Sequence, residues 1–238
     1  MTGGRVVLRY FPVLGRAQAL RHALADAGIA FEDVRVPPAE WAHVRQDPAF
    51  AGRYRALPTL SWGDATVSET LPIAFFLARH LGEYARLSDE AIAAREAACS
   101  SSYIDVILRL ADVIYADLLY PGADPGRSFA AIASRIVQKL ELLDGQMPHG
   151  AWIGGDTPAV ADFFVIEAFE STRYFLGPAR DARLRERLPR LGRLADALRE
   201  RPRLFAAMKS RPARFTARPD EDRVIEALRT VDLGSAGL

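Results

Sequence analysis

Cysteines, clustered histidines and long apolar runs are scarce in this sequence, and each shortage excludes a class of protein or site. The single cysteine, Cys99, excludes an intramolecular disulfide and a zinc site built on several cysteines. The four histidines stand apart without metal-binding spacing, so no metal site is expected. No apolar run approaches the roughly 18–20 residues that cross a bilayer, and the first residues lack the apolar segment of a signal peptide. We therefore expect a cytoplasmic protein without a membrane span.

Charge of one sign is not in excess either. The 238 residues include 31 basic and 30 acidic side chains, which gives a net charge of +1. Because no basic excess attracts phosphate groups, neither nucleic acid nor an anionic membrane is an expected partner. With 50% hydrophobic residues, the chain is long enough to bury a core without a metal or a disulfide.

The first 82 residues alternate between strand and helix patterns. Apolar and β-branched runs predict strands over residues 6–10, 31–36, 59–62 and 65–68, and apolar side chains at helical spacing predict helices over 15–28 and 71–81. The first helix has its apolar face at Ala17, Leu20, Leu24 and Ala27, with Arg21, His22 and Asp26 expected on other faces. Residues 37–56 carry prolines and arginines and predict a long loop, with room for one helical turn.

These elements imply a four-stranded mixed sheet. A strand–helix–strand crossover makes the first two strands parallel. The dipeptide Gly63-Asp64 is a hairpin signal, which makes the last two strands antiparallel. The order β-α-β-β-β-α predicts an α/β, thioredoxin-like N-terminal domain over residues 1–82.

The remainder of the chain predicts helices alone. Apolar stripes at helical spacing recur from residue 89 onward, and residues 163–169 are apolar on nearly all sides, which indicates a buried central helix. We expect an all-α C-terminal domain over residues 89–238, with the boundary near residues 83–89.

The opening segment Leu-Arg-Tyr-Phe-Pro-Val-Leu-Gly-Arg, residues 8–16, resembles the tyrosine-type glutathione S-transferases, most closely the pi and sigma classes. The resemblance covers essentially the whole chain. It implies a thioredoxin-like glutathione-binding domain, a helical domain that lines an electrophile pocket, and a homodimer. Glutathione would be the co-substrate, and no tightly bound cofactor is implied.

Two residues of this segment carry the implied catalysis. Tyr10 ends the first predicted strand, and by the resemblance its hydroxyl donates a hydrogen bond to the sulfur of glutathione. A free thiol has a pKa of about 8.5, and a donor aimed at the thiolate favours the charged form. Arg16, expected in the first turn of the first helix, would shape the surroundings of the thiol. A core tyrosine and a surface arginine are the alternatives.

Further residues match positions that bind glutathione in the family. The Leu57-Pro58 bond is expected to be cis, with the backbone of Leu57 pairing with the cysteinyl part of glutathione. Glu69 and Thr70 stand before the second helix, where Thr70 is expected to cap the helix and to bind the γ-glutamyl carboxylate.

The resemblance also places Phe11, Trp41 and Arg45 around glutathione. Arg45 stands where the family often has a lysine for the glycine carboxylate, and a guanidinium can bind a carboxylate with two hydrogen bonds. Arg53 and Arg55 remain alternatives for this role, because the loop length differs from that of the pi class.

Four residues are assigned to the dimer and to the second substrate. Asp105 would reach the γ-glutamyl ammonium in the neighbouring subunit, with a solvated helix-face aspartate as the alternative. Val13, Leu14 and Tyr115 would line the electrophile pocket, and Tyr115 could equally be a core aromatic residue.

Two other features are interpreted as structural. Residues 155–162 resemble the family's capping box, but Ala159 stands where serine or threonine is expected, while Asp162 is retained. Cys99 lies in a helix among alanines and serines, which predicts a packed and inert thiol.

The last segment predicts one more amphipathic helix, over residues 220–231. Val224, Ile225, Leu228 and Val231 repeat at helical spacing. A helix this short is marginal alone and should dock on the body of the protein. Two docking places are left open: a lid near Tyr10, Val13 and Tyr115, which resembles the alpha class, and a site elsewhere on the helical domain.

The function hypothesis is a detoxifying glutathione transferase that activates the thiol as a thiolate for attack on hydrophobic electrophiles. Glutathione-dependent isomerisation or peroxide reduction would use the same thiolate and is the alternative activity. A noncatalytic binding protein with the same fold is the alternative of another class. The identity of the electrophile does not follow from the sequence.

Overall fold

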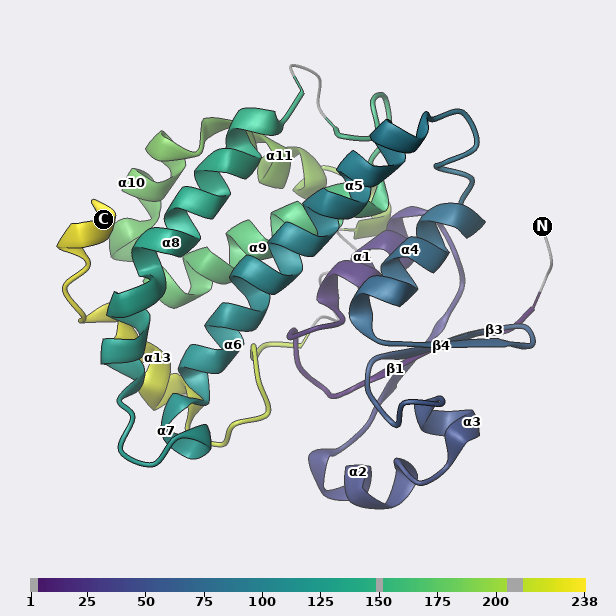
Figure 1. Cartoon of the computed structure of the whole chain (residues 1–238), viewed down its shortest axis with the longest axis horizontal. Coiled ribbons are helices and arrows are strands. Elements are labelled where there is room, and N and C mark those ends of the chain that lie inside the picture. The colour runs from purple at the N-terminus through teal and green to yellow at the C-terminus, as the bar shows by residue number, and fades with distance from the viewer. Residues whose placement is uncertain (1–3, 149–151, 205–211) are drawn as a thin grey trace. The chain divides into compact units, whose positions relative to one another are not determined.

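The computed structural model describes residues 4–148, 152–204 and 212–238, which form two compact units (Figure 1). The first unit is made by residues 1–96 together with 199–217, and the second by residues 97–198 together with 218–238. Each unit therefore contains a segment from the C-terminal part of the chain.

The first unit is built on a four-stranded mixed sheet. Its strands are β1 (Val6–Tyr10), β2 (Glu32–Arg35), β3 (Thr59–Trp62) and β4 (Ala65–Ser68) in the order β2-β1-β3-β4. β1 is parallel to β2, and the β3–β4 pair is antiparallel, so both predicted pairings are confirmed. β1 also pairs with β3 in the antiparallel sense, which makes β1 a central strand. Tyr10, the last residue of β1, is opposite Arg35.

The helices of this unit are α1 (Gln18–Asp26), α2 (Pro38–Val44), α3 (Pro48–Ala51) and α4 (Thr70–His80), followed by the first part of α5 (Asp89–Ser102). The expectation of one helical turn within residues 37–56 is wrong, because two short helices form there. Each begins with a proline in its first turn, where the missing N–H costs nothing. Asp47 caps α3 by accepting the N–H of Ala49 at 2.9 Å.

Helix α1 differs from the prediction in its start and in its buried face. It begins at Gln18 rather than at residue 15. Arg21 and His22, expected away from the core, are only 5% and 4% exposed. Arg21 stands four residues after Ala17 and three before Leu24, so it shares their face of the helix.

In the described part of the second unit the regular elements are all helical, and loops with an isolated bridge between Trp152 and Gly155 connect them. After α5 come a π-helical turn η1 (Tyr103–Ile107), α6 (Leu108–Ile114), α7 (Ala116–Leu119), α8 (Pro125–Gln146), α9 (Val160–Leu176), α10 (Pro178–Arg187), α11 (Pro189–Arg199), α13 (Glu221–Arg229) and a 3₁₀ turn η2 (Gly234–Ala236). α9 is buried along nearly its whole length, as the apolar run predicts.

The start of α9 shows how the chain manages without the expected cap. Ala159 is the N-cap residue and offers no side-chain acceptor. The fully buried Asp162 accepts the N–H of Ala159 at 2.8 Å, and also those of Ile153 at 2.8 Å and Gly154 at 3.2 Å. The retained aspartate thus ties the preceding turn to the helix.

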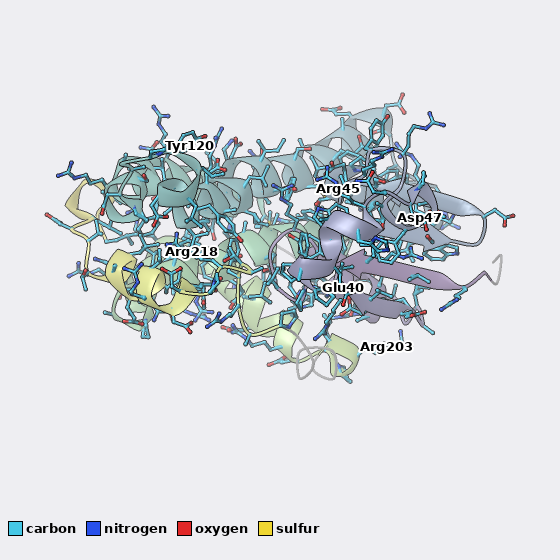
Figure 2. All side chains as sticks on the ribbon, turned by 90° about the horizontal axis from the view of Figure 1, so that it is seen from below. Glu40, Arg45, Asp47, Tyr120, Arg203 and Arg218 are labelled. Atoms are coloured by element: carbon cyan, nitrogen blue, oxygen red, sulfur yellow. The ribbon has the colours of Figure 1, made fainter. Side chains whose placement is uncertain are left out.

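The C-terminal helix α13 forms as predicted and packs against α6, α8 and α9 of its own unit. This is the docking on the helical domain that the sequence left open beside the lid. Val224, Ile225 and Leu228 are buried in this contact. Arg218, just before the helix (Figure 2), fastens it by ion pairs with Asp117 and Asp220.

No helix within residues 4–148, 152–204 and 212–238 combines the length and apolarity needed to cross a membrane. In the same ranges, no three His, Cys, Asp or Glu side chains gather closely enough to hold a metal ion.

Candidate functional site

The Tyr10 side chain is buried at the end of β1, where the chain turns toward α1. It is 6% exposed and lies in an apolar cluster with Val13, Ala17, Val36 and Leu57. Its hydroxyl oxygen accepts the backbone N–H of Arg16 at 3.0 Å. The polar end of the side chain is therefore placed by the turn that precedes α1, while the ring is placed by the apolar cluster.

The turn between Tyr10 and α1 requires a glycine at position 15. Gly15 has a φ of +39°, which L side chains rarely adopt. A Cβ atom there would lie 2.7 Å from the Tyr10 hydroxyl oxygen and 3.3 Å from the carbonyl oxygen of Phe215. The close approach of this backbone to the hydroxyl thus depends on the absence of a side chain.

A segment from far along the chain closes the other side of this turn. The N–H of Leu14 donates to the carbonyl of Arg214 at 2.8 Å, and that of Gly15 donates to Phe215 at 3.0 Å. Phe215 is 1% exposed. No local pattern in the sequence signals this backbone pairing across 200 residues.

Arg16 and Thr70 meet through a backbone oxygen. Arg16 precedes α1 rather than occupying its first turn, and its side chain is exposed. Its carbonyl accepts the hydroxyl of Thr70 at 3.1 Å. The expectation that Thr70 caps the helix is wrong, because Thr70 is the first residue of α4 and Glu69 is the N-cap residue.

The Leu57–Pro58 bond is cis, as expected. The carbonyl of Pro58 accepts the N–H of Glu69 at 3.0 Å, so these two candidate positions are adjacent. Glu69 has a φ of +76°, an uncommon conformation for a residue with a side chain. Such backbone strain is concentrated at ligand-binding sites in proteins, which makes Glu69 a candidate on conformational grounds as well.

A row of rings leads from Tyr10 to an exposed arginine. The ring centroids of Tyr10 and Phe11 are 5.4 Å apart, and those of Phe11 and Trp41 are 5.9 Å apart, both edge to face. The guanidinium carbon of Arg45 (Figure 2) lies 5.6 Å from the centroid of Trp41. Arg55, one of the alternatives to Arg45, donates to the side chain of Gln46 at 2.9 Å.

Arg21 is a residue of this site that the sequence analysis missed. Its guanidinium carbon lies 5.8 Å from the Tyr10 ring centroid, and its Nε donates to Asp33 at 3.1 Å. Burial lowers the pKa of the Arg21 side chain from its ordinary value, and the charge of Asp33 opposes that shift. The signal in the sequence was its spacing of four residues from Ala17, on the apolar face of the helix.

Two candidate residues belong to the second unit. Asp105 lies in the π-helical turn, and its Oδ2 forms an ion pair with Nζ of Lys139 at 2.9 Å. The Asp105 side chain is 41% exposed. π-helical turns of this kind are frequent at functional sites. Tyr115 is the C-cap residue of α6 and is half-buried.

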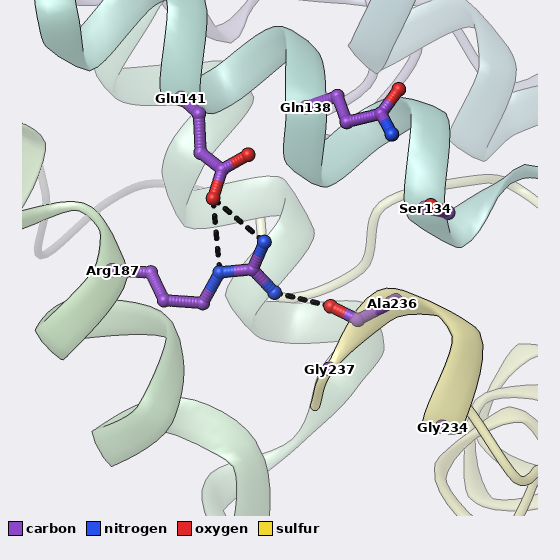
Figure 3. Close-up of a pocket in the computed structure, with 7 residues that line it drawn as sticks. All are labelled: Ser134, Gln138, Glu141, Arg187, Gly234, Ala236 and Gly237. Atoms are coloured by element: carbon purple, nitrogen blue, oxygen red, sulfur yellow. Dashed lines mark hydrogen bonds and ion pairs between the residues drawn. The ribbon is translucent and has the colours of Figure 1, made fainter.

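A polar pocket of about 510 Å³ also lies in the second unit, where the C-terminal turn η2 meets α8 (Figure 3). Its arginine, Arg187, donates to the carboxylate of Glu141 at 2.6 Å and also bonds the carbonyl of Ala236. These contacts fasten the C-terminus to α8 and α10, and the pocket contains none of the candidate residues.

Cys99 in α5 is a buried free cysteine, 3% exposed, as the packed thiol predicts. Its inertness stays a prediction.

Comparisons with known proteins find related sequences, although one kind of comparison finds no match. No family model matches the chain. Glutathione S-transferase P of Capra hircus is 30% identical over 161 residues, which cover 66% of this chain and 72% of that protein. Hematopoietic prostaglandin D synthase of Gallus gallus is 25% identical over 163 residues, covering 66% and 74%.

Solved structures show the same fold. Monomeric Na-GST-3, a glutathione S-transferase from the hookworm Necator americanus, superposes with a TM-score of 0.68 at 20% identity, over 87% of this chain and 98% of that chain. The predicted combination of a thioredoxin-like part and an all-α part is thereby confirmed. The sequence match to the Capra hircus protein covers nearly three quarters of its length, and this chain belongs to the glutathione S-transferase family.

Proposed function

We propose that the protein is a glutathione transferase that transfers glutathione to hydrophobic electrophiles. The observation that supports this most is the group around the Tyr10 hydroxyl. In this group the Tyr10 hydroxyl accepts the N–H of Arg16, and the hydroxyl of Thr70 donates to the carbonyl of Arg16. Leu57 packs in the same apolar cluster as Tyr10, and the N–H of Glu69 donates to the carbonyl of the neighbouring Pro58. Membership of the family supports the same activity.

The proposed chemistry begins at the sulfur of glutathione. The Tyr10 hydroxyl donates a hydrogen bond to the thiolate, which lowers the pKa of the thiol from about 8.5. The N–H of Arg16 donates to the same hydroxyl oxygen. Such a chain of hydrogen bonds polarises the O–H group and strengthens its donation to the sulfur. The thiol proton leaves to solvent. With an aryl halide, the thiolate then attacks the carbon that bears the halogen, the carbon–sulfur bond forms, and the carbon–halogen bond breaks with release of halide.

The remainder of glutathione would be bound largely by backbone. The Leu57 backbone, before the cis bond, pairs with the cysteinyl part. The N-terminus of α4 at Thr70 binds the γ-glutamyl carboxylate, since helix N-termini present free N–H groups and positive potential. Glu69 faces the γ-glutamyl ammonium. Phe11 and Trp41 flank the tripeptide, and Arg45 binds the glycine carboxylate.

The second substrate and the assembly are also part of the proposal. Val13 and Leu14 contribute to the electrophile pocket. The protein forms a homodimer in which Asp105, oriented by Lys139, reaches the neighbouring subunit's glutathione. A monomeric relative with this fold exists in Necator americanus, so sedimentation at micromolar concentration is the direct test. A 26.2 kDa species would contradict both the dimer and this role of Asp105.

Isomerisation is the second candidate activity. It is favoured by the similarity to the Gallus gallus protein named hematopoietic prostaglandin D synthase. The same thiolate would act in both reactions, so a panel of aryl halides, hydroperoxides and isomerase substrates, each with glutathione present, separates the activities.

The decisive experiment compares the wild type with Tyr10→Phe. Retention on immobilised glutathione is expected for both proteins, because the substitution removes only the donor to sulfur. At pH 7 we expect kcat to fall about 10- to 100-fold, as the thiol loses between one and two units of pKa depression. The pH–rate profile should move upward. A variant with an unchanged rate and profile would remove Tyr10 from the mechanism, and a wild type without glutathione binding would overturn the proposed function.

A further inference from the structure

The guanidinium of Arg21 hydrogen-bonds the backbone of the turn that follows Tyr10. Its Nη1 donates to the carbonyl of Val13 at 2.8 Å, and its Nη2 donates to the carbonyl of Phe11 at 3.3 Å. These two carbonyls lie on either side of Pro12, directly after Tyr10. Because the planar guanidinium presents its donors in a rigid fork, it fixes the path of this turn at two points.

The charge of Arg21 is only partly compensated. Its Nε donates to both carboxylate oxygens of Asp33, at 3.1 and 3.2 Å. Arg35 donates to the same carboxylate at 2.9 Å. Two arginines thus share the carboxylate of Asp33. The terminal nitrogens of Arg21 bond the neutral carbonyl oxygens of Val13 and Phe11, and its side chain is only 6% exposed.

We propose that Arg21 is a positioning residue of the Tyr10 site, which fixes the turn after Tyr10 and supplies a buried positive charge that favours an anion at the Tyr10 hydroxyl. The proposal rests on the proposed function in one respect, namely that the anion favoured during catalysis is the glutathione thiolate. The charge of Arg21 stabilises it through Tyr10, without touching the substrate.

Other charged groups stand on the elements around Tyr10. They are Arg9 on β1, Glu32, Asp33 and Arg35 on β2, Glu40, His43 and Arg45 on α2, Arg16 in the turn, His22 and Asp26 on α1, Glu69 before α4, and Arg214 in the returning segment. His22 is 4% exposed and hydrogen-bonds the side chain of Gln18 at 2.8 Å. The other side chains in this list are half-buried or exposed, so water and salt screen them. Arg21 combines deep burial with contact to the Tyr10 ring, and its field at the hydroxyl is therefore screened least.

Opposite substitutions distinguish this role from a structural one. Arg21→Gln removes the positive charge and should raise the pKa of the Tyr10 hydroxyl by about half to one unit. Asp33→Asn removes the compensating negative charge and should lower the same pKa. Arg21→Lys keeps the charge but not the fork, and should retain most of the wild-type value. A role limited to stability predicts that Arg21→Gln and Asp33→Asn act in the same direction.

Two readouts are measured on each variant. The first is the pKa of the Tyr10 phenol in the unliganded protein, taken from the ultraviolet titration difference between each variant and its Tyr10→Phe counterpart. The second is the pH midpoint of kcat/KM for glutathione. The matched control is Arg5→Gln, which removes an exposed arginine paired with Glu32, the neighbour of Asp33 on β2. It should change neither value.

Each result decides the proposal. Opposite shifts in Arg21→Gln and Asp33→Asn, with the control unchanged, support it. Shifts in the same direction, or none in proteins whose circular dichroism is unchanged, overturn it. If Arg21→Gln does not fold, the downward shift expected in Asp33→Asn is decisive. If the wild type does not turn over glutathione, the proposed function fails, while the phenol titration still tests Arg21.

Discussion

Two buried arginines, one in each unit, bind an irregular segment through backbone oxygens, and they differ in how their charge is compensated. Arg21 shares the single carboxylate of Asp33 with Arg35. Arg218 bonds the carbonyl of Ile114 at 2.6 Å and has two carboxylates as partners.

The electrostatic consequences are opposite. Burial lowers the pKa of Arg21 below its ordinary value. Hydrogen bonds from Arg218 to Asp117 and Asp220 raise the pKa of Arg218 above it. A cation with two carboxylate partners is neutralised locally and acts as an anchor. A cation that shares its carboxylate with a second arginine still exerts an electric field on its surroundings. Arg21 is in this position, and it lies beside the Tyr10 ring.

Truncation after Arg218, which removes α13, should have the largest effect on stability. It removes Asp220 and the whole of α13, whose buried Val224, Ile225 and Leu228 contribute roughly 1.5–3 kcal/mol each. We expect a loss of several kcal/mol in the free energy of unfolding, measured by denaturant titration. A truncated protein of unchanged stability, with a higher KM for the hydrophobic substrate alone, would instead support α13 as a lid.

Removing the anchoring charge should have the next largest effect. Arg218→Met leaves the buried carbonyl of Ile114 without its donor and the partly exposed Asp117 without its cation, and an unsatisfied buried acceptor costs about 1–3 kcal/mol. The control is Arg223→Met, whose side chain is 76% exposed and whose loss should change stability little. A shift in the pH–rate profile of Arg218→Met, like that expected for Arg21→Gln, would erase the distinction between the two arginines.

A steric change tests the Tyr10 turn without altering charge. Gly15→Ala combines a positive φ with a Cβ atom 2.7 Å from the Tyr10 hydroxyl oxygen, so it should destabilise the protein by about 1–3 kcal/mol and lower kcat. Gly63→Ala is the matched control, since its φ is also positive, at +57°, but nothing lies within 4 Å of the added atom. Equal kcat in the two variants would show that the hydroxyl tolerates displacement.

Acidification should have the smallest effect on stability, and it should act on the ion pairs that Arg218 forms with Asp117 and Asp220. Hydrogen bonds from Arg218 lower the pKa of Asp117 and of Asp220 below the ordinary 3.8. Their contribution to stability is therefore complete above about pH 4 and is lost as the pH falls through the lowered values. Asp117→Asn should reduce stability by no more than about 1 kcal/mol at pH 7, and its difference from the wild type should shrink toward pH 2. A constant difference would contradict the assignment.

Much of the fold could be predicted because it depends on local patterns. The strands at Thr59–Trp62 and Ala65–Ser68 form within the predicted bounds, since Gly63-Asp64 favours a tight hairpin between two short strands. The burial of α9 follows from a run that is apolar on all sides. The candidate positions Tyr10, Leu57 and Thr70 came from a resemblance to a family, and their common environment is a finding of the structure.

Errors arose where a residue's partners are distant in the sequence. Arg21 was placed outside the core because a charged side chain is rarely buried without partners. Its partners are Asp33 on another strand and two carbonyls of an irregular turn. The long loop was mispredicted for a related reason, since the prolines that suggest irregular backbone also begin short helices.

The sequence by itself determined the order of the four strands with α1 and α4, the hairpin, the buried central helix and the amphipathic C-terminal helix, because each follows from spacing within one segment. Only the tertiary structure decided that residues 214–215 pair with the turn after Tyr10, that Arg21 lies against the Tyr10 ring, and that α13 packs on α6, α8 and α9. The physical reason is that backbone pairing and the burial of charge depend on which groups approach from other elements, and no local pattern records them.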